Sequence, residues 1–216
     1  MKLINSFGPN PRIVRMFMAE KGLSIPSTDI DMLRGENRKP PYTDKNPGGQ
    51  TPSLELDDGS VLGETVVICE YLEEKHPTPA LIGSNAQERA EARQWQRRIE
   101  LNITEYIYNA FRYSEGLGLF KDRVHCIPAA APDMKVSAQS WLKKLDGLIA
   151  GRDFIAGKQL RLVDIVLYCC LDFAKDVGQP LDPSNANIAA WFKRIDSRPS
   201  ATASLSPNWA DMKMRG

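Results

Sequence analysis

The segment NPGGQTP, at residues 46–52, indicates how the N-terminal part of this chain folds, together with GET at residues 63–65. Between them lie two runs typical of β-strands, Pro52 to Leu56 and Ser60 to Leu62, separated by the sequence DDG, a strong hairpin-turn signal. The Thr51-Pro52 bond at the head of the first run is a place where a cis peptide can sit and turn the Thr51 N–H and C=O outward. A free strand edge of this kind can pair with the backbone of a peptide-like ligand.

The GET triplet predicts a second receptor at the start of a helix. Thr65 at the N-cap offers its hydroxyl and the first N–H groups of the helix to a carboxylate. The helix dipole favours an anion there by roughly 0.3–1 kcal/mol. Glu64, which precedes it, can hold an ammonium group. The two segments together therefore predict a receptor for an amino-acid group beside a receptor for a peptide backbone.

Outward from these segments, the first 76 residues predict the order βαβ, then a loop, then ββα. Periodicity and turn signals support each part. Besides the hairpin, the expected elements are a strand at Lys2 to Ser6, a helix at Arg12 to Lys21, a strand at Ser27 to Met32, an irregular region at Leu33 to Gln50 with at most a short helix at Tyr42 to Lys45, and a helix at Thr65 to His76.

The pattern changes after the proline-containing stretch from Pro77 to Ser84. Helical spacing then dominates, at Ala86 to Gly116, Met134 to Ala150, Leu162 to Val177 and Ile188 to Ser197. We therefore expect an α/β domain with a mixed four-stranded sheet, followed by an all-helical domain. The expected divisions are residues 1–78 for the first domain, 79–86 for a linker, 87–200 for the helical domain and 201–216 for a tail.

The composition is that of an ordinary globular protein. The 216 residues include 28 Lys and Arg against 27 Asp and Glu, a net charge of +1, and 42% of them are hydrophobic. This length allows one large domain or two small ones. A charge near zero leaves no basic footprint, so we expect no nucleic-acid partner.

The cysteines form neither a Cys-x-x-Cys pair nor a spacing that suits a tetrahedral metal, so we expect no metal site and no dithiol redox centre. No Gly-x-Ser-x-Gly motif is present, and protein-borne triad chemistry is not expected. No apolar run has the length of a membrane span and Met1 opens no basic-then-apolar leader, so we expect a cytoplasmic protein with free thiols and no membrane partner. The four cysteines are Cys69, Cys126, Cys169 and Cys170.

In their order along the chain, these segments resemble cytosolic glutathione transferases, with similarity to bacterial theta-like and nu-like members. GENRKP at residues 35–40, continued by residues 46–52, resembles the glutathione loop, and residues 63–65 resemble the Glu-Ser/Thr motif. FIAG at residues 154–157 and LVDI at residues 162–165 resemble the signature of the helical domain. The resemblance runs from about Met1 to Pro199 and implies a thioredoxin-like domain, a helical domain and a homodimer, with glutathione as co-substrate.

The resemblance also implies which residues contact glutathione. Thr51 would pair through its backbone with the cysteinyl unit, with Pro52 as the cis proline, and Glu64 and Thr65 would hold the amino and carboxylate groups of the γ-glutamyl unit. Two further polar residues occupy positions that contact the glycyl end or the backbone. The complete expected set is Asn37, Gln50, Thr51, Pro52, Glu64 and Thr65.

The residue that activates the glutathione sulfur departs from the family pattern. Alignment with serine-type members places Gly8 at the catalytic position, and alignment with cysteine-type members places Asn10 there. The candidates are therefore Asn10, whose amide can donate to the sulfur at a helix start, and Ser6, at the end of a strand. One donor and the helix dipole are enough to favour a thiolate. The absent cysteine argues against members that reduce mixed disulfides with a protein thiol.

A second departure concerns Arg161, where the family has Ser or Thr capping the helix that begins near Leu162, in a box with Asp164. Loss of the capping hydroxyl is a change of about 1 kcal/mol. Asp164 can still accept hydrogen bonds from backbone N–H groups, so the signature is weaker but the fold assignment stands.

The electrophile site implied by the resemblance lies between the Gly8 loop and the first long helices of the second domain. Three function hypotheses follow: a transferase that conjugates glutathione to a hydrophobic electrophile or reduces a peroxide with it, a binding or regulatory module without turnover, and a glutathione-dependent etherase or dehalogenase. The aromatic residues expected near the electrophile are Phe7, Tyr106, Phe111 and Tyr113.

Overall fold

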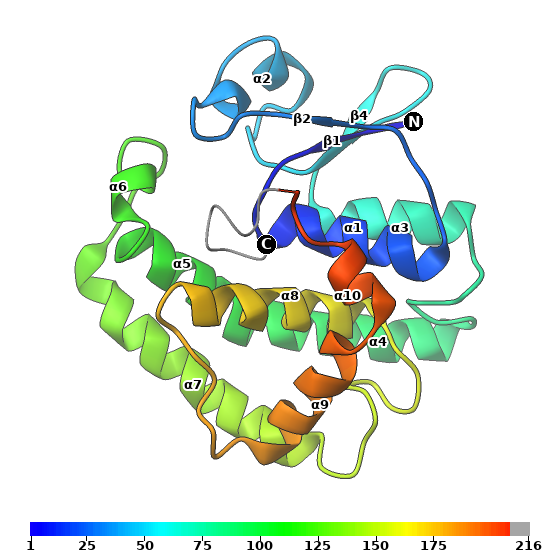
Figure 1. The fold of residues 1–216 in the computed structure, drawn as a ribbon, viewed down its shortest axis with the longest axis vertical. Helices are drawn as coiled ribbons and strands as arrows, with labels where there is room; N and C mark the ends of the chain where they lie inside the picture. Colours follow the sequence, from blue (N-terminus) through cyan, green and yellow to red (C-terminus); the bar gives the residue numbers. More distant parts are fainter. Residues whose placement is uncertain (208–216) are drawn as a thin grey trace. The chain divides into compact units, whose positions relative to one another are not determined.

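The N-terminal unit is built on a mixed sheet with the strand order β2-β1-β3-β4 (Figure 1). In the computed structural model, which describes residues 1–207, β1 (Lys2–Asn5) pairs in parallel with β2 (Ser27–Asp29). It pairs on its other edge, antiparallel, with β3 (Ser53–Glu55), which in turn pairs with β4 (Val61–Leu62). The expected four-stranded mixed sheet and βαβ-ββα order are confirmed.

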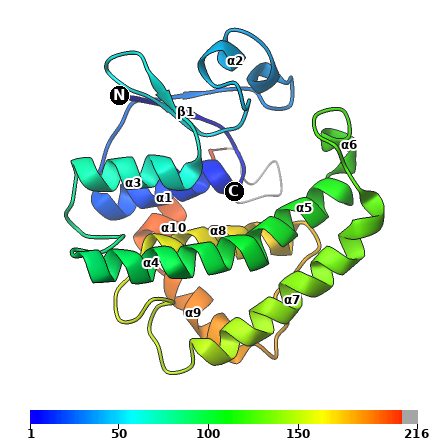
Figure 2. The same cartoon turned by 180° about the vertical axis from the view of Figure 1, so that it is seen from behind.

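Helices lie on both faces of this sheet. Helices α1 (Pro9–Lys21) and α3 (Thr65–Lys75) contact each other on one side, and α2 (Tyr42–Lys45) lies on the other, preceded by a 3₁₀ turn, η1 (Glu36–Arg38) (Figures 1 and 2). Apolar side chains of α1 and α3 form a buried core beneath the sheet, and their burial stabilises this unit. This core includes Ile13, Val14, Phe17, Ile68 and Leu72.

A buried ion pair extends this unit past α3. The Lys21 Nζ lies 2.5 Å from Glu73 Oε2 and donates to the carbonyl oxygens of His76 and Pro79. The Glu73 Oε1 accepts the N–H of Ile82 at 2.9 Å. Because these bonds attach the proline-containing stretch to α1 and α3, the first unit ends at Ile82, within the stretch that the sequence predicts as a linker.

The chain returns to the first unit at its C-terminal end. Residues 198–207 belong to this unit, and α10 (Pro199–Ala203) packs against α1. Sequence patterns placed residues 198–200 in the helical domain, because a helix so short carries no readable periodicity. The predicted tail at 201–216 lies outside the described residues from position 208 onward.

The second unit, Gly83–Ser197, is helical, as expected. Helix α8 lies at its centre, since all of its residues from Leu162 to Ala174 are buried. Helices α4 and α5 continue one another through a π-helical turn, which replaces the single long helix predicted there (Figure 2). The elements are α4 (Ala86–Ile99), η2 (Glu100–Thr104), α5 (Glu105–Tyr113), α6 (Leu117–Phe120), η3 (Pro128–Ala130), α7 (Ala131–Leu148), α8 (Leu162–Asp176) and α9 (Ala186–Asp196).

The start of α8 is closed by Asp164 in place of a capping hydroxyl. The fully buried Asp164 carboxylate accepts the N–H of Arg161 at 2.8 Å, the N–H of Ile155 at 2.9 Å and the indole N–H of Trp191 at 2.8 Å. The Arg161 guanidinium instead pairs with Glu88 on α4, at 3.0 Å. The backbone cap expected of Asp164 is therefore present, and the arginine ties α8 to α4.

Candidate functional site

The Thr51-Pro52 peptide is cis, and it immediately precedes β3. Thr51 is 8% exposed, and its hydroxyl donates to the Met32 Sδ at 3.1 Å. Within residues 1–207, its backbone N–H and C=O have no hydrogen-bond partner. Since backbone groups of this kind are strong donors and acceptors, this edge is available to an extended ligand.

Two residues that sequence reasoning missed hold the loop in front of Thr51. The Asn46 Nδ2 donates to the Gln50 carbonyl oxygen at 2.8 Å, and the Tyr42 hydroxyl donates to the same oxygen. The Asn46 side chain also lies against Gly63, within van der Waals distance of where a Cβ would stand. Asn46 therefore connects the loop to the turn that precedes α3. The only signal in the sequence was the position of Asn46 at the head of the segment at 46–52.

Asn37, predicted to contact the ligand, lies inside this loop. It is 3% exposed, and its Nδ2 donates to the Gly49 carbonyl oxygen at 2.6 Å. Gly49 has a φ of 58°, and a Cβ there would stand 2.7 Å from the Asn37 carbonyl oxygen, so only glycine fits. The neighbouring Arg38, also missed, contacts Gly49 through its side chain and lies 3.4 Å from the Gly48 oxygen. Arg38 thus brings a positive charge to the loop.

The start of α3 is open, in the sense that no side chain among residues 1–207 caps it. The N-cap is Glu64, whereas the sequence predicted Thr65 there; Thr65 is the first residue of the helix. Glu64 has a φ of 62°, and among residues 1–207 no other non-glycine residue has a positive φ. Such a backbone costs about 1–3 kcal/mol and is found where a site needs it. Glu64 is exposed and does not cap the helix, and in the described part of the chain its carboxylate and the Thr65 hydroxyl have no hydrogen-bond partner. An acceptor for an ammonium and donors for a carboxylate therefore stand side by side.

The two candidates for activating a sulfur lie on either side of the turn between β1 and α1. Gly8 is the N-cap of α1, with a φ of 108°, and the helix begins Pro9-Asn10-Pro11. Because proline lacks an N–H, the Asn10 N–H is the one backbone donor among the first three positions of the helix. Asn10 is half-buried, and its side-chain amide has no hydrogen-bond partner within residues 1–207. The Ser6 hydroxyl, 4% exposed, donates to the Ile30 carbonyl oxygen at 3.3 Å.

Of the aromatic residues expected near the electrophile, Phe7 belongs to the first unit and is half-buried. The other three lie on α5 of the second unit, and Tyr106 and Tyr113 are also half-buried. Phe111 packs edge-on against Phe173 on α8, with ring centroids 5.0 Å apart, and against Phe120 at 5.9 Å. Such packing contributes to stability, so Phe111 has a structural role in the helical unit.

The four cysteines are free thiols in the structure, as expected, and Cys69, Cys169 and Cys170 are buried. Burial raises the pKa of Cys170 far above its ordinary range, which keeps this thiol protonated. In the described part of the chain, no three His, Cys, Asp or Glu side chains gather in the way that a metal ion needs. No helix between residues 1 and 207 is long and apolar enough to cross a membrane.

Both units match models of one protein family. The model of the glutathione S-transferase N-terminal domain matches residues 7–75, and that of the glutathione S-transferase C-terminal domain matches residues 131–199. The chain belongs to the glutathione S-transferase family.

Individual relatives agree with this assignment. A glutathione S-transferase domain-containing protein from Marinobacter aquaeolei VT8 is 31% identical in sequence, with a TM-score of 0.87 over 94% of this chain and 100% of the relative. Glutathione S-transferase 2 from Saccharomyces cerevisiae is 29% identical over 207 residues, covering 89% of this chain and 84% of its own length. Maleylacetoacetate isomerase from Pseudomonas aeruginosa is 43% identical over 82 residues, which are 37% of this chain and 39% of the isomerase.

Proposed function

We propose that this chain is an enzyme that binds glutathione, stabilises its thiolate and transfers it to a hydrophobic electrophile, or reduces a peroxide with it. The observation that carries this proposal is the open start of α3 beside the unpaired edge of Thr51. Glutathione is a peptide with an amino-acid group at one end, and these two receptors have the matching chemistry. A homodimer and a cytoplasmic location remain predictions from the sequence.

In the proposed complex, the cysteinyl unit pairs with the Thr51 N–H and C=O. The γ-glutamyl carboxylate accepts hydrogen bonds from the Thr65 hydroxyl and the first N–H groups of α3, where the helix dipole also favours an anion. The γ-glutamyl ammonium pairs with Glu64, whose carboxylate is exposed. The Gln50 side chain, exposed at the end of the loop, lies on the same segment as Thr51.

The glycyl carboxylate needs a donor or a cation. Asn37 was predicted for this role, but its amide donates to the Gly49 carbonyl oxygen. We assign Asn37 to shaping the loop, and Arg38 to the glycyl carboxylate, because a guanidinium binds carboxylates through charge-assisted hydrogen bonds. Arg38 already contacts the Gly48–Gly49 backbone beside Gln50.

The sulfur is proposed to bind at the start of α1. A thiol has an ordinary pKa near 8.5, and donors to the thiolate lower it. Asn10 supplies its backbone N–H and its side-chain amide, and the helix dipole adds to both. The Ser6 hydroxyl is engaged with Ile30, so the proposal rests on Asn10. Once the proton has left to solvent, the thiolate attacks the electrophilic carbon and displaces its leaving group, or it attacks a peroxide oxygen, which breaks the O–O bond and releases an alcohol. In the second case a further glutathione reacts with the resulting sulfenic acid to give glutathione disulfide and water.

Binding and turnover test the proposal separately. The protein should be retained on immobilised glutathione and released by free glutathione. It should also turn over at least one of a nitroaryl chloride, an organic hydroperoxide or an aryl ether, the last of which would indicate the etherase. Asn10→Ala should raise the pKa of the bound thiol and lower kcat roughly tenfold, with little change in the KM for glutathione. Retention without turnover would favour the binding module, and no retention would refute the proposal.

A second candidate function is the isomerisation of a conjugated dicarbonyl substrate. It is favoured by the 43% identity to 82 residues of the Pseudomonas aeruginosa maleylacetoacetate isomerase. A thiolate that adds to an activated double bond, allows rotation and then leaves would catalyse this reaction without consuming glutathione. Isomerisation of maleylacetoacetate that requires glutathione but does not deplete it would support this candidate. Consumption of one glutathione per turnover would contradict it.

A further inference from the structure

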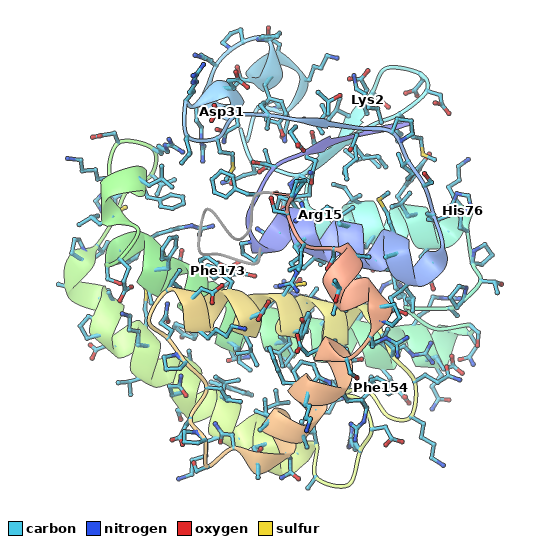
Figure 3. All side chains as sticks on the ribbon, viewed as in Figure 1. Lys2, Arg15, Asp31, His76, Phe154 and Phe173 are labelled. Atoms are coloured by element: carbon cyan, nitrogen blue, oxygen red, sulfur yellow. The ribbon has the colours of Figure 1, made fainter. Side chains whose placement is uncertain are left out.

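Arg15 joins the end of β1 and helix α1 to a C-terminal segment that is far away in sequence. Its Nη1 donates to the Asn5 Oδ1 at 2.8 Å and to the Ser6 carbonyl oxygen at 2.9 Å, and its Nε donates to the Ser204 carbonyl oxygen at 2.8 Å. Figure 3 labels Arg15 on α1, near the end of β1. The Asn5 Nδ2 in turn donates to Asp29 on β2 at 2.6 Å. A chain of hydrogen bonds therefore runs from β2 through β1 and α1 to the C-terminal segment.

These bonds lie on both sides of the turn that leads into α1, the helix that carries Asn10. Asn5 and Ser6 are the last residues before the turn at residues 7–8, and Arg15 lies on the helix that follows it. Arg15 thus ties the strand side of the turn to the helix side. The backbone between the two anchors includes Gly8, which by itself has wide conformational freedom.

The C-terminal segment holds Arg15 from the other side. This segment, residues 198–206, is attached to α1 by the bidentate pair of Arg198 and Glu20, at 2.6 and 2.7 Å. The fully buried Arg12 also donates to the Ala201 carbonyl oxygen at 3.2 Å. Ser204 is therefore fixed relative to α1, and a guanidinium with fixed partners on both sides has little freedom.

We infer that Arg15 is a positioning residue for the proposed thiolate site. By bonding Asn5, Ser6 and Ser204 at once, it sets where the start of α1, and hence Asn10, stands. The C-terminal segment, which follows the helical unit in sequence, thereby helps to position the proposed thiolate site of the N-terminal unit. The inference rests on the proposed function for its effect on the sulfur, whereas its effect on the turn is independent of glutathione.

The test compares Arg15→Met with Arg198→Met. Arg198→Met removes the bonds to Glu20 and loosens the same segment, but leaves the bonds to Asn5 and Ser6 intact. Hydrogen exchange of a peptide covering residues 5–10 should be roughly tenfold faster in Arg15→Met than in wild type, and within about twofold of wild type in Arg198→Met. Arg15→Lys keeps the charge without the planar fork, so it should be intermediate, and it replaces Arg15→Met if that variant does not fold.

A second readout follows the bound thiol. In Arg15→Met, the pKa of the thiol of bound glutathione should rise by roughly 0.5–1 unit, and kcat at pH 6.5 should fall about 3- to 10-fold. The affinity for S-methylglutathione should stay within about twofold of wild type. Equal exchange and equal thiol pKa in the Arg15 and Arg198 variants would overturn the inference. If wild type binds no glutathione, the proposed function fails, and the exchange comparison still decides the role of Arg15.

Discussion

Two helix starts in this molecule use a carboxylate in opposite ways. At α8, the Asp164 carboxylate is fully buried and accepts three N–H groups, from Arg161, Ile155 and Trp191. At α3, the Glu64 carboxylate is exposed, does not cap its helix and stands on a backbone with positive φ. The first helix start is closed by the protein itself, and the second is left open.

The difference shows how to separate a structural helix start from a binding one. Both leave N–H groups without helical partners, which must find an acceptor. At α8 the buried Asp164 carboxylate accepts the N–H of the N-cap residue Arg161, and its remaining bonds go to N–H groups of Ile155 and Trp191 outside the helix. At α3 the donors remain available beside a free carboxylate, at a cost in backbone strain. Substitutions at the two starts should therefore affect different properties.

The largest effect is expected at the closed start. Asp164→Ala leaves the N–H groups of Arg161, Ile155 and Trp191 without their acceptor in the core, and should lower the free energy of unfolding by about 3–4 kcal/mol. The matched control is Asp133→Ala in the exposed first turn of α7, which should change it by about 0.5 kcal/mol. Urea unfolding measures both, and equal losses in the two variants would contradict the structural role of Asp164.

The contribution of Asp164 to the free energy of unfolding should also depend on pH. Burial raises the pKa of Asp164 from 3.8 to about 6, so the native state binds this proton more tightly than the unfolded chain does. The resulting stabilisation is complete below pH 4 and is lost as the pH rises through 6, by up to about 3 kcal/mol. Asp164→Asn does not titrate. The difference in unfolding free energy, wild type minus Asp164→Asn, should therefore fall from pH 4 to pH 7; a constant or rising difference would exclude this origin.

At the open start, affinity should change while stability does not. Glu64→Ala removes the proposed partner of the γ-glutamyl ammonium, and should weaken glutathione binding about 10- to 100-fold, or about 1.4–3 kcal/mol. Its unfolding free energy should stay within about 0.5 kcal/mol of wild type, because Glu64 caps nothing. Glu74→Ala, exposed on the same helix, is the control for charge. Calorimetric titration with unchanged affinity in Glu64→Ala would remove Glu64 from the site.

The smallest effect is expected from Thr65. Thr65→Val keeps the shape and removes the hydroxyl, so glutathione affinity should fall about 3- to 10-fold. Thr65→Ser, which retains the hydroxyl, should bind within about twofold of wild type. If the two variants bind equally well, the carboxylate is held by the backbone N–H groups of α3 alone.

Several features of the fold were predictable because their causes are local. At most a short helix was expected around Tyr42 to Lys45, where the structure has α2, and the DDG turn separates β3 from β4. The π-helical turn at Glu100–Thr104 was not predicted, since its residues continue a helical pattern without a break. Helix α10 was also missed, because its place is set by Arg12 and by the pair of Arg198 and Glu20.

In the candidate site, too, features with local causes were predictable and features set by tertiary contacts were not. The strand, turn and helix start in the two predicted receptor segments could be read from the chain, since turn residues, proline and a helix start act over a few residues. The packed fold was needed to show that Asn37 and Asn46 support the loop, that Ser6 is engaged with Ile30, and that Arg15 ties the β1–α1 turn to a segment near residue 204. A buried polar group takes whichever partner the packed fold brings within reach, and no sequence spacing records that choice.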